Sequence, residues 1–145
     1  MRHRLSALSM TIVALCGLSA GTARADEALS ETLHQLAKDH AAAYDREDVD
    51  ATLALVHSRS PEYDATRTLL QEQFRVQDLE TEVVSFHYIG HDNEFAYARV
   101  KLRTHDTTAA FADNTVDTVT LFHREDGRWK YWSDYIVGVE VADDD

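Results

Sequence analysis

The stretch from Thr115 to Val137 reads TVDTVTLFHREDGRWKYWSDYIV, and it decides the fold. Two arms rich in β-branched and aromatic residues flank the dipeptide Asp126-Gly127, which is a strong signal for a two-residue turn. Asp and Gly both tolerate the positive φ angles that such a turn requires. The stretch therefore predicts a β-hairpin, which the rest of the chain extends with strands or covers with helices.

The sequence upstream of this hairpin changes its period at about Leu79. After that residue apolar side chains alternate with polar ones, as in a half-buried strand. The pattern predicts strands over 81–89 and 94–104, joined by a turn at Gly90-His91-Asp92-Asn93, with a polar loop over 105–114. Together with the hairpin, they make a four-stranded antiparallel meander.

Three helices are expected before the strands. Apolar spacings of three and four residues predict the first helix over 30–44, with an inward stripe at Leu29, Leu33, Leu36, Ala37, His40 and Tyr44. Asp48 is placed to cap a short second helix that ends at His57. Ser60-Pro61-Glu62 is a favourable start for a third helix, which runs to about Val76. Helices followed by a meander predict an α+β fold with the helices on one face of the sheet.

Three motifs resemble the NTF2-like superfamily, also called SnoaL-like or cone-like α+β. They are Tyr44-x-x-Glu47-Asp48-x-Asp50, Ser60-Pro61-Glu62-Tyr63, and the closing Asp126-Gly127-Arg128-Trp129-Lys130-Tyr131. The resemblance covers nearly all of residues 28–138. It implies an NTF2-like cone, with three N-terminal helices packed on a curved antiparallel four-stranded sheet. The domain would span residues 26–145, with an acidic tail over about 140–145.

The N-terminus has the features of a secretory signal peptide over residues 1–25. Arg2 and Arg4 give a positive start, residues 5–18 are mostly apolar, and Ala23-Arg24-Ala25 is a small-x-small cleavage site. An uncleaved anchor helix is the alternative, although the apolar run is short for a membrane span. We expect a periplasmic or secreted protein. Its mature form would contain no cysteine, because Cys16 lies in the signal.

The charge of the chain limits its partners. It contains 14 basic and 26 acidic residues, which gives a net charge of −12. Loss of Arg2, Arg4 and Arg24 with the signal would leave 11 basic residues against 26 acidic ones, a net charge of −15. Such a chain repels nucleic acid and anionic lipid, so we expect neither nucleic-acid binding nor membrane attachment after signal cleavage. The acidic end, Asp143-Asp144-Asp145, is most simply a solvated terminus.

The two turns give a provisional register for the sheet. Glu125 is placed opposite Arg128, His123 opposite Lys130, His91 opposite Glu94, and His87 opposite Ala98; Ala98 is then placed beside His123. One face, expected to meet the helices, carries Val83, Ser85, Ala98, Val100, Leu102, Val119, Leu121, Trp132 and Ile136, with the polar residues His87, His123, Asp117 and Asp134. The other carries Phe86, Tyr88, Tyr97, Arg99, Lys101, Arg103, Phe122, Trp129, Tyr131 and Tyr135. This aromatic and basic face suggests an interface, and the resemblance implies a homodimer through it; a monomer is the alternative.

Two residues are candidates for catalysis. Asp134 would sit among apolar neighbours, where poor solvation raises the pKa of a carboxylate toward the range of a general base. The alternative is that Asp134 pairs with an arginine or lies near the sheet rim. His57 would act with it as an acid or base, or it simply lies at the negative end of a helix dipole. Tyr44, Tyr63, Phe74 and Trp132 are the expected lining of a ligand pocket.

No further chemistry is indicated. The chain has no phosphate loop, nucleotide fingerprint or nucleophile elbow, so we expect no cofactor. We expect no metal, because in this register His87 and His123 lie two strands apart. The leading hypothesis is a non-catalytic module that binds a small apolar ligand or a protein. The alternative is a cofactor-free isomerase, cyclase or dehydratase with Asp134 as the general base.

Overall fold

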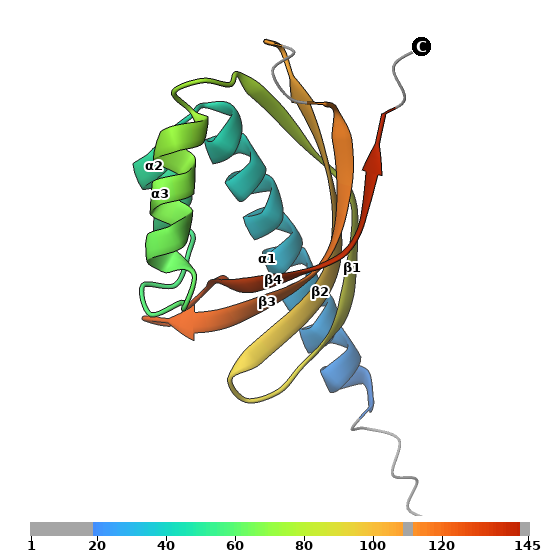
Figure 1. Ribbon diagram of the computed structural model, residues 1–145. Coiled ribbons are helices and arrows are strands. Elements are labelled where there is room, and N and C mark those ends of the chain that lie inside the picture. Colours follow the sequence, from blue (N-terminus) through green and yellow to red (C-terminus); the bar gives the residue numbers. More distant parts are fainter. Residues whose placement is uncertain (1–18, 109–111, 143–145) are drawn as a thin grey trace, which may run out of the picture.

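The computed structural model describes residues 19–108 and 112–142 (Figure 1). Three helices, α1 (Ser19–Asp45), α2 (Val49–Ala54) and α3 (Tyr63–Gln73), precede four strands, β1 (Leu79–His91), β2 (Phe95–Asp106), β3 (Asn114–Glu125) and β4 (Arg128–Val141). The predicted basic start, the apolar run with Cys16, and the acidic end Asp143–Asp145 lie outside the described residues. Helix α1 begins upstream of the predicted start, so that Ala23, Arg24 and Ala25 are helical.

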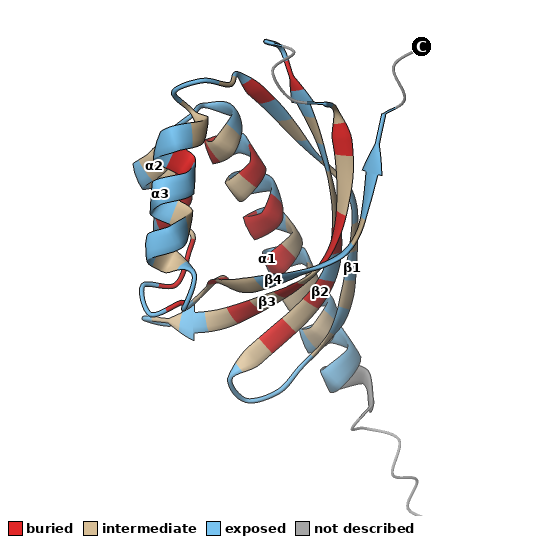
Figure 2. Ribbon diagram, viewed as in Figure 1, coloured by how far each residue is buried: buried red, intermediate tan, exposed pale blue. Residues whose placement is uncertain are grey.

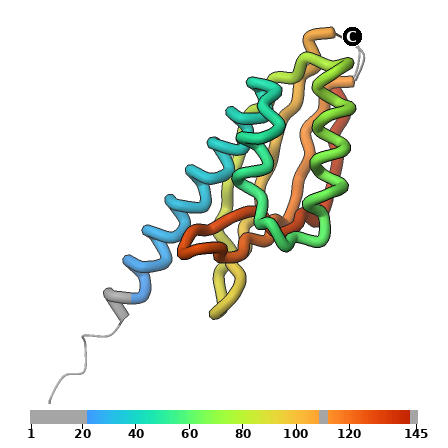
Figure 3. The backbone as a smooth tube through the Cα atoms, turned by 90° about the vertical axis from the view of Figure 1, so that its left-hand side faces the viewer, coloured from blue at the N-terminus to red at the C-terminus, as the bar shows by residue number. Residues whose placement is uncertain are grey.

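The strands form one antiparallel sheet in the order β1-β2-β3-β4. The sheet is strongly curved, and α1 runs along its concave side (Figure 1). In Figure 3, both α1 and α3 lie in front of the strands. The predicted α+β class and the curved four-stranded sheet are confirmed. The packing of the helices is only partly as expected: α1 makes the close contacts with the sheet, whereas α2 packs on α1 and α3 packs on α2.

The core lies between α1 and the concave face. Buried residues recur along α1 and alternate with more exposed ones along the strands (Figure 2). Leu33 is fully buried and Leu36 nearly so, and both join a cluster completed by Val56, Ala96, Ala98, Val100, Phe122 and Tyr131. The helical stripe predicted from spacing is therefore the face that packs on the sheet. Burial of such side chains contributes about 1.5–3 kcal/mol each.

The second helix begins at the predicted cap, whereas the third begins at Tyr63, three residues after the predicted Ser60. Asp48 caps α2 by accepting a hydrogen bond from the Ala51 N–H at 2.9 Å, and Ser60 accepts one from the Glu62 N–H at 3.1 Å, just before α3. Residues 55–60, which we call the strap, run along the outer edge of β4. The Tyr131 N–H donates to the Leu55 carbonyl, and the His57 N–H donates to the Tyr131 carbonyl.

The last turn has the predicted geometry. Asp126 and Gly127 adopt φ angles of 51° and 78°, the two positive values of a type I′ turn. Glu125 pairs with Arg128 and His123 pairs with Lys130, as expected. The turn alone fixes this part of the register, because a two-residue loop leaves no freedom in how the arms meet.

The predicted register of the first hairpin is wrong. His91 pairs with Ala96 rather than Glu94, and His87 pairs with Arg99 rather than Ala98. The Asp92 carboxylate accepts hydrogen bonds from the Glu94 and Phe95 N–H groups, which makes a wider turn. Two irregularities in β1, at Val83/Ser85 and Tyr88/Gly90, shift the pairing further. Phe86 and Tyr88 therefore pair with Val100 and Ala98 and face inward, opposite to the prediction.

The predicted register between the hairpins is also wrong. Ala98 pairs with Thr120, and His123 pairs with Phe95. The difference is three residues, and an odd shift exchanges the two faces of a strand. Phe122, Thr120 and Thr118 consequently face inward, whereas Asp117, Val119, Leu121 and His123 face outward. His87 and His123 do not share a row.

A bulge changes the direction of the side chains along β4. The pairing with β3 shifts between Leu121 and Phe122, so that Tyr131 lies opposite Phe122 and Ser133 lies opposite Leu121. The extra residue, Trp132, contacts the outward residues Phe95 and His123. Tyr131 faces inward, contrary to the prediction, and Trp132 does not. Asp134 and Ile136 face inward as expected. The bulge at Trp132 reverses the direction of the side chains that follow it, and this cancels the exchange of faces caused by the shifted β2–β3 register.

The outer face is less apolar than predicted. Phe86, Tyr88, Phe122 and Tyr131 have moved to the inner face, and Trp129 packs against the core. The basic residues that remain are paired with acids: both Arg99 and Lys101 contact Asp117, and Arg103 contacts Glu82. An outer face of neutralised charges is a weaker candidate for an interface than the aromatic surface we expected.

Candidate functional site

A chain of hydroxyl and carboxylate groups crosses the concave face. Thr120 is buried and donates a hydrogen bond to the Asp134 carboxylate at 2.6 Å, across the β3–β4 ladder. Thr118 and Thr120 lie on the same side of β3, with their hydroxyl oxygens 3.2 Å apart. The Thr118 hydroxyl donates to the Val100 carbonyl at 3.3 Å, so Thr120 is the hydroxyl that orients the Asp134 carboxylate.

The Asp134 carboxyl is poorly hydrated, although part of its residue is open to solvent. Its residue is exposed to solvent, but the surrounding protein removes enough water to raise the pKa of its carboxyl above the ordinary value. The Thr120 hydrogen bond opposes this shift, and the negative charge of Glu62 adds to it. No cationic side chain in the described residues forms an ion pair with it. Partial removal of water disfavours the charged form of a carboxyl and raises its pKa.

His40 and Tyr131 border the same wall. Their ring centroids are 4.5 Å apart. Burial lowers the pKa of His40 to about 4. Burial, followed by the charge of Asp134, raises the pKa of Tyr131 above its ordinary value. Both rings are therefore uncharged at neutral pH, and Asp134 is the group at this site whose charge can respond to a ligand.

Tyr44 and Phe74 lie together where α1 meets the end of α3. Their rings meet edge to face with centroids 5.0 Å apart, and the Tyr44 hydroxyl donates to the Gln73 side chain. Burial raises the pKa of Tyr44 to about 12. Tyr44 continues the row of rings from His40, whose centroid is 6.4 Å away. Tyr63 packs against the core, and Arg67 lies over its ring.

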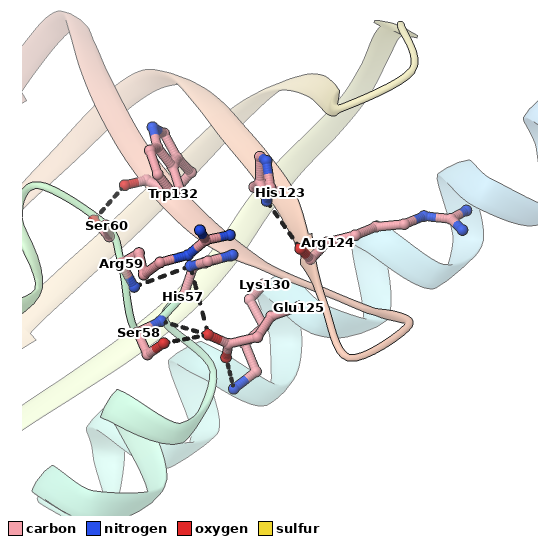
Figure 4. Close-up of polar contacts among 9 residues, drawn as sticks. All are labelled: His57, Ser58, Arg59, Ser60, His123, Arg124, Glu125, Lys130 and Trp132. Carbon is pink, nitrogen blue, oxygen red and sulfur yellow. Dashed lines mark hydrogen bonds and ion pairs between the residues drawn. The ribbon is translucent and has the colours of Figure 1, made fainter.

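His57 lies in a different cluster from Asp134. It is 1% exposed, and its ring meets those of Trp132 and His123 edge to face, at 5.0 and 4.8 Å (Figure 4). Its Nδ1 atom accepts from the Arg59 N–H at 3.0 Å, which requires the tautomer with its proton on Nε2. That buried Nε2 atom has no hydrogen-bond partner within the described residues. Because Trp132 faces outward, His57 and Trp132 do not share the concave wall with Asp134.

Glu125 anchors the strap below His57 (Figure 4). Its carboxylate accepts hydrogen bonds from the Ser58 N–H and hydroxyl, and lies 2.7 Å from the Lys130 ammonium. These contacts, first that of Lys130 and then those of Ser58, lower the pKa of Glu125 to about 2. The Ser60 hydroxyl holds the other end of the strap by donating to the Trp132 carbonyl. This cluster attaches the strap to the hairpin, and its charges are already paired.

The threonines were not identified from the sequence. Thr118 and Thr120 stand two apart on a strand, a spacing that places them on one face. The incorrect register assigned that face to the outside, so their relation to Asp134 was hidden. The sequence pattern points to Glu125 only as the residue that precedes the last turn.

Two grooves on the surface lie away from this wall. One, of about 580 Å³, runs between α1 and the last turn and is lined in part by Leu36, Arg128 and Trp129. The other, of about 590 Å³, is lined mainly by Asp45 and residues of β1. Neither includes Asp134 or His57. In residues 19–108 and 112–142, no three His, Cys, Asp or Glu side chains are grouped to hold a metal. Among the helices of those residues, none has the length and apolarity to cross a membrane.

Several solved structures share this architecture, among them proteins described as NTF2-like. A proposed scytalone dehydratase from Novosphingobium aromaticivorans has a TM-score of 0.68 and 11% identity, covering 85% of this chain and 93% of its own. A proposed dehydratase of the NTF2-like family from Streptomyces avermitilis has a TM-score of 0.61 and 14% identity, covering 76% and 95%. A ketosteroid isomerase-like protein from Erwinia carotovora atroseptica has a TM-score of 0.56 and 12% identity, covering 75% and 96%. At such identities the likeness shows the fold alone, so the chain has an NTF2-like fold.

A match at the level of the sequence identifies the family. A family model for the C-terminal domain of the anti-sigma-I factor RsgI9 matches residues 35–141. The match covers most of the chain, so this protein belongs to the RsgI9 C-terminal domain family. A search of curated proteins gave no match.

Proposed function

We propose that the protein is an exported, non-catalytic module that binds a small, mainly apolar ligand on its concave face. The observation that carries the proposal is the Asp134 carboxylate, which is poorly hydrated and oriented by Thr120, without a cationic partner in the described chain. Such a group provides one polar contact in otherwise apolar surroundings, the arrangement that small-molecule sites use. Membership of a family named for part of an anti-sigma factor also favours binding over catalysis.

The apolar part of the proposed site lies next to Asp134. Ile136 pairs with Thr118 on the concave face and is 68% exposed. Val100 forms the wall on the other side of Thr118. His40 and Tyr131 are uncharged at neutral pH, so the rings beside the carboxylate add apolar surface and no charge. The ligand that fits has an apolar body and one uncharged hydrogen-bonding group.

Nile red, an uncharged apolar dye, is a suitable probe for this surface. We expect saturable binding by fluorescence, and we expect Ile136→Lys to weaken it about tenfold or more, because a ligand over this position would have to desolvate a charge. Asp134→Asn keeps the acceptor for Thr120 and should change the affinity less than about threefold. It should also raise the thermal midpoint at neutral pH, because a poorly hydrated charge is removed.

Val84→Lys provides the control. Val84 is exposed and lies on β1, away from Asp134, so the same substitution there should leave dye binding unchanged. Equal loss of binding in the Val84 and Ile136 variants would show that the dye does not report on the concave face, and would contradict the proposed site.

The same carboxylate favours a second candidate, proton transfer on a carbonyl compound with Asp134 as general base. Its raised pKa suits that role. His57 would not assist, because it is buried among outward-facing rings. A direct test follows α-proton exchange of 2-tetralone in D₂O by NMR. Exchange that requires the protein and disappears in Asp134→Asn, with the fold intact, would assign the protein to the enzymes; we expect no such exchange.

The proposed export rests on the sequence alone. Residues 1–25 have the charge, apolar run and cleavage site of a signal peptide. When the whole 145-residue sequence is expressed with a compatible secretion system, we expect the exported protein to begin at Asp26. Mass spectrometry of the intact protein checks this; an N-terminus at Met1 in that fraction would support the uncleaved anchor instead.

A further inference from the structure

The groove between α1 and the last turn lies apart from the concave wall that carries Asp134. It has a volume of about 580 Å³, within the range of roughly 300–1,000 Å³ that is usual for small-molecule sites. Its large apolar lining residues are Leu36, which is nearly buried, and Trp129, which is half-buried and packs against the core. Ligand sites combine such apolar surface with a few polar or charged groups, so the charges along the walls decide what this groove can bind.

The wall formed by α1 is negatively charged. Glu31, Gln35 and Asp39 line the groove at intervals of four residues, which places them in one row along the helix. The Gln35 side chain donates a hydrogen bond from Nε2 to Asp39 Oδ1 at 2.8 Å, and this contact orients the carboxylate. In the described part of the chain, neither Glu31 nor Asp39 forms an ion pair with a cationic side chain. Both carboxylates are therefore available to a cationic group of a ligand.

The opposite wall is positively charged. Arg128 lines it, is exposed, and forms no ion pair among the residues that the structure describes. Arg124 pairs with Trp129 across the β3–β4 ladder, and its guanidinium carbon lies 4.7 Å from the centroid of the Trp129 ring. Figure 4 shows the Arg124 side chain directed away from His57 and its neighbours. The positive charge of this wall thus comes from two arginines, one in the lining and one stacked on a lining residue.

A ligand of this groove must satisfy both walls. The acids of α1 and Arg128 do not pair with each other across the groove, so each wall keeps its charge. A purely cationic ligand would meet Arg128, and a purely anionic one would meet two carboxylates on a chain with a net charge of −12. A molecule that carries one positive and one negative group, joined by an apolar body, meets neither obstacle.

We propose that this groove binds a short peptide with free termini and an apolar side chain. The ammonium group of the peptide lies toward the carboxylates of α1, its carboxylate lies on Arg128, and its side chain packs on Leu36 and Trp129. A guanidinium group fits a carboxylate through two parallel hydrogen bonds. The backbone of a dipeptide extends about 7 Å, which lets its termini bridge two walls that are too far apart for a direct ion pair. In a free amino acid, by contrast, both charged groups are attached to one carbon atom.

Alanyl-phenylalanine is a suitable probe, and NMR titration of the indole N–H signals detects where it binds. The chain contains two tryptophans, and Trp132→Phe assigns their signals. We expect a saturable shift at Trp129 and none at Trp132, whose ring contacts residues of the outer face. We also expect the dipeptide to bind about tenfold more tightly than alanyl-phenylalanine amide and N-acetyl-alanyl-phenylalanine, because each of these lacks one of the two charges.

Substitutions in the two walls should act on different peptides. Arg128→Gln should weaken binding of the dipeptide about tenfold but should not weaken binding of its amide, which has no carboxylate to lose. The combined variant Glu31→Gln/Asp39→Asn should weaken the dipeptide similarly but should not weaken the N-acetyl form, which has no ammonium group. Arg75→Gln is the matched control, because Arg75 is exposed and follows α3, which contributes no residue to the groove.

The comparison of the three peptides needs no substitution, so it decides the case if a variant fails to fold. Equal affinity for the dipeptide and both blocked forms, a shift at Trp132 instead of Trp129, the absence of saturable binding, or an equal loss in Arg75→Gln would each overturn the proposal. Ile136→Lys, which tests the concave-face site, should leave binding of the dipeptide unchanged. The two sites can therefore be tested separately.

Discussion

Phe122→Ala is expected to lower the free energy of unfolding by about 3–5 kcal/mol, the range for removing a large aromatic side chain from a core. Phe122 is fully buried, and its ring lies 5.0 Å from that of Tyr131 in the centre of the concave face. The truncation leaves a cavity between the sheet and α1, because neighbours such as Ala96 and Ala98 are too small to fill it. Urea unfolding followed by tryptophan fluorescence gives the change in free energy.

The adjacent residue is the matched control for this result. Leu121 faces the other side of β3 and remains partly exposed, so Leu121→Ala should cost only about 1 kcal/mol. The two variants together test which face of β3 is inward. The provisional register predicted the reverse order, with Leu121 inside, and a larger loss for Leu121→Ala would restore that register.

Acidification is expected to remove up to about 3 kcal/mol of stability through His40 alone, since each pKa unit corresponds to about 1.4 kcal/mol. Burial holds the pKa of His40 at about 4 in the folded protein, against an ordinary value of 6.5. Between these two pH values the unfolded chain binds the proton and the folded chain does not. The stability that depends on uncharged His40 is therefore fully present above about pH 6.5. It falls as the pH drops toward 4, and it shows no further loss below that pH.

His40→Phe removes the titrating group and keeps a ring beside Tyr131. Between pH 6.5 and pH 4, the free energy of unfolding should decrease less for this variant than for the unsubstituted protein. His40→Gln provides a second non-titrating variant. His105→Asn is the control, because its pair with the exposed Asp113 raises the pKa of His105 and so acts in the opposite direction. Parallel pH profiles for the His40 variants and the unsubstituted protein would show that His40 is not held uncharged by the fold.

Local patterns predicted much of the secondary structure. The helical stripe through Leu33 and Leu36 packs as its spacing indicated, and Asp48 caps the second helix. The turn at Asp126-Gly127 brought Glu125 opposite Arg128. In each case the deciding interactions are made within a few residues, so the sequence contains them directly.

The assignment of the sheet faces failed because it depends on counting across irregularities. The odd shift between β2 and β3, the two shifts in β1 and the bulge at Trp132 each exchange inside and outside along part of a strand. Alternation cannot resolve strands in which both faces contain Val, Phe, Tyr or Thr, because the pattern itself gives no preferred side. Packing against α1 decides that side, and it selects Phe122 over Leu121.

The candidate site likewise combines one feature that the sequence predicts with others that only the tertiary structure decides. Asp134 was recognised as a carboxylate among apolar residues, and its raised pKa agrees with that expectation. The expected partner, His57, joins the strap and Trp132 instead, while the partners of Asp134 are Thr120 and the nearby ring of Tyr131. These relations arise from the β3–β4 ladder and its bulge, which no residue near Asp134 in the sequence specifies.

The sequence by itself determined the α+β class, the order of helices and strands, the last turn and the strongly acidic character, because each depends on composition or on neighbours in the chain. Only the tertiary structure decided which side chains form the concave wall, which of them surround Asp134, and which charges lie on either side of the groove beside α1. Those features depend on register and curvature, and both are set by how distant segments pack together.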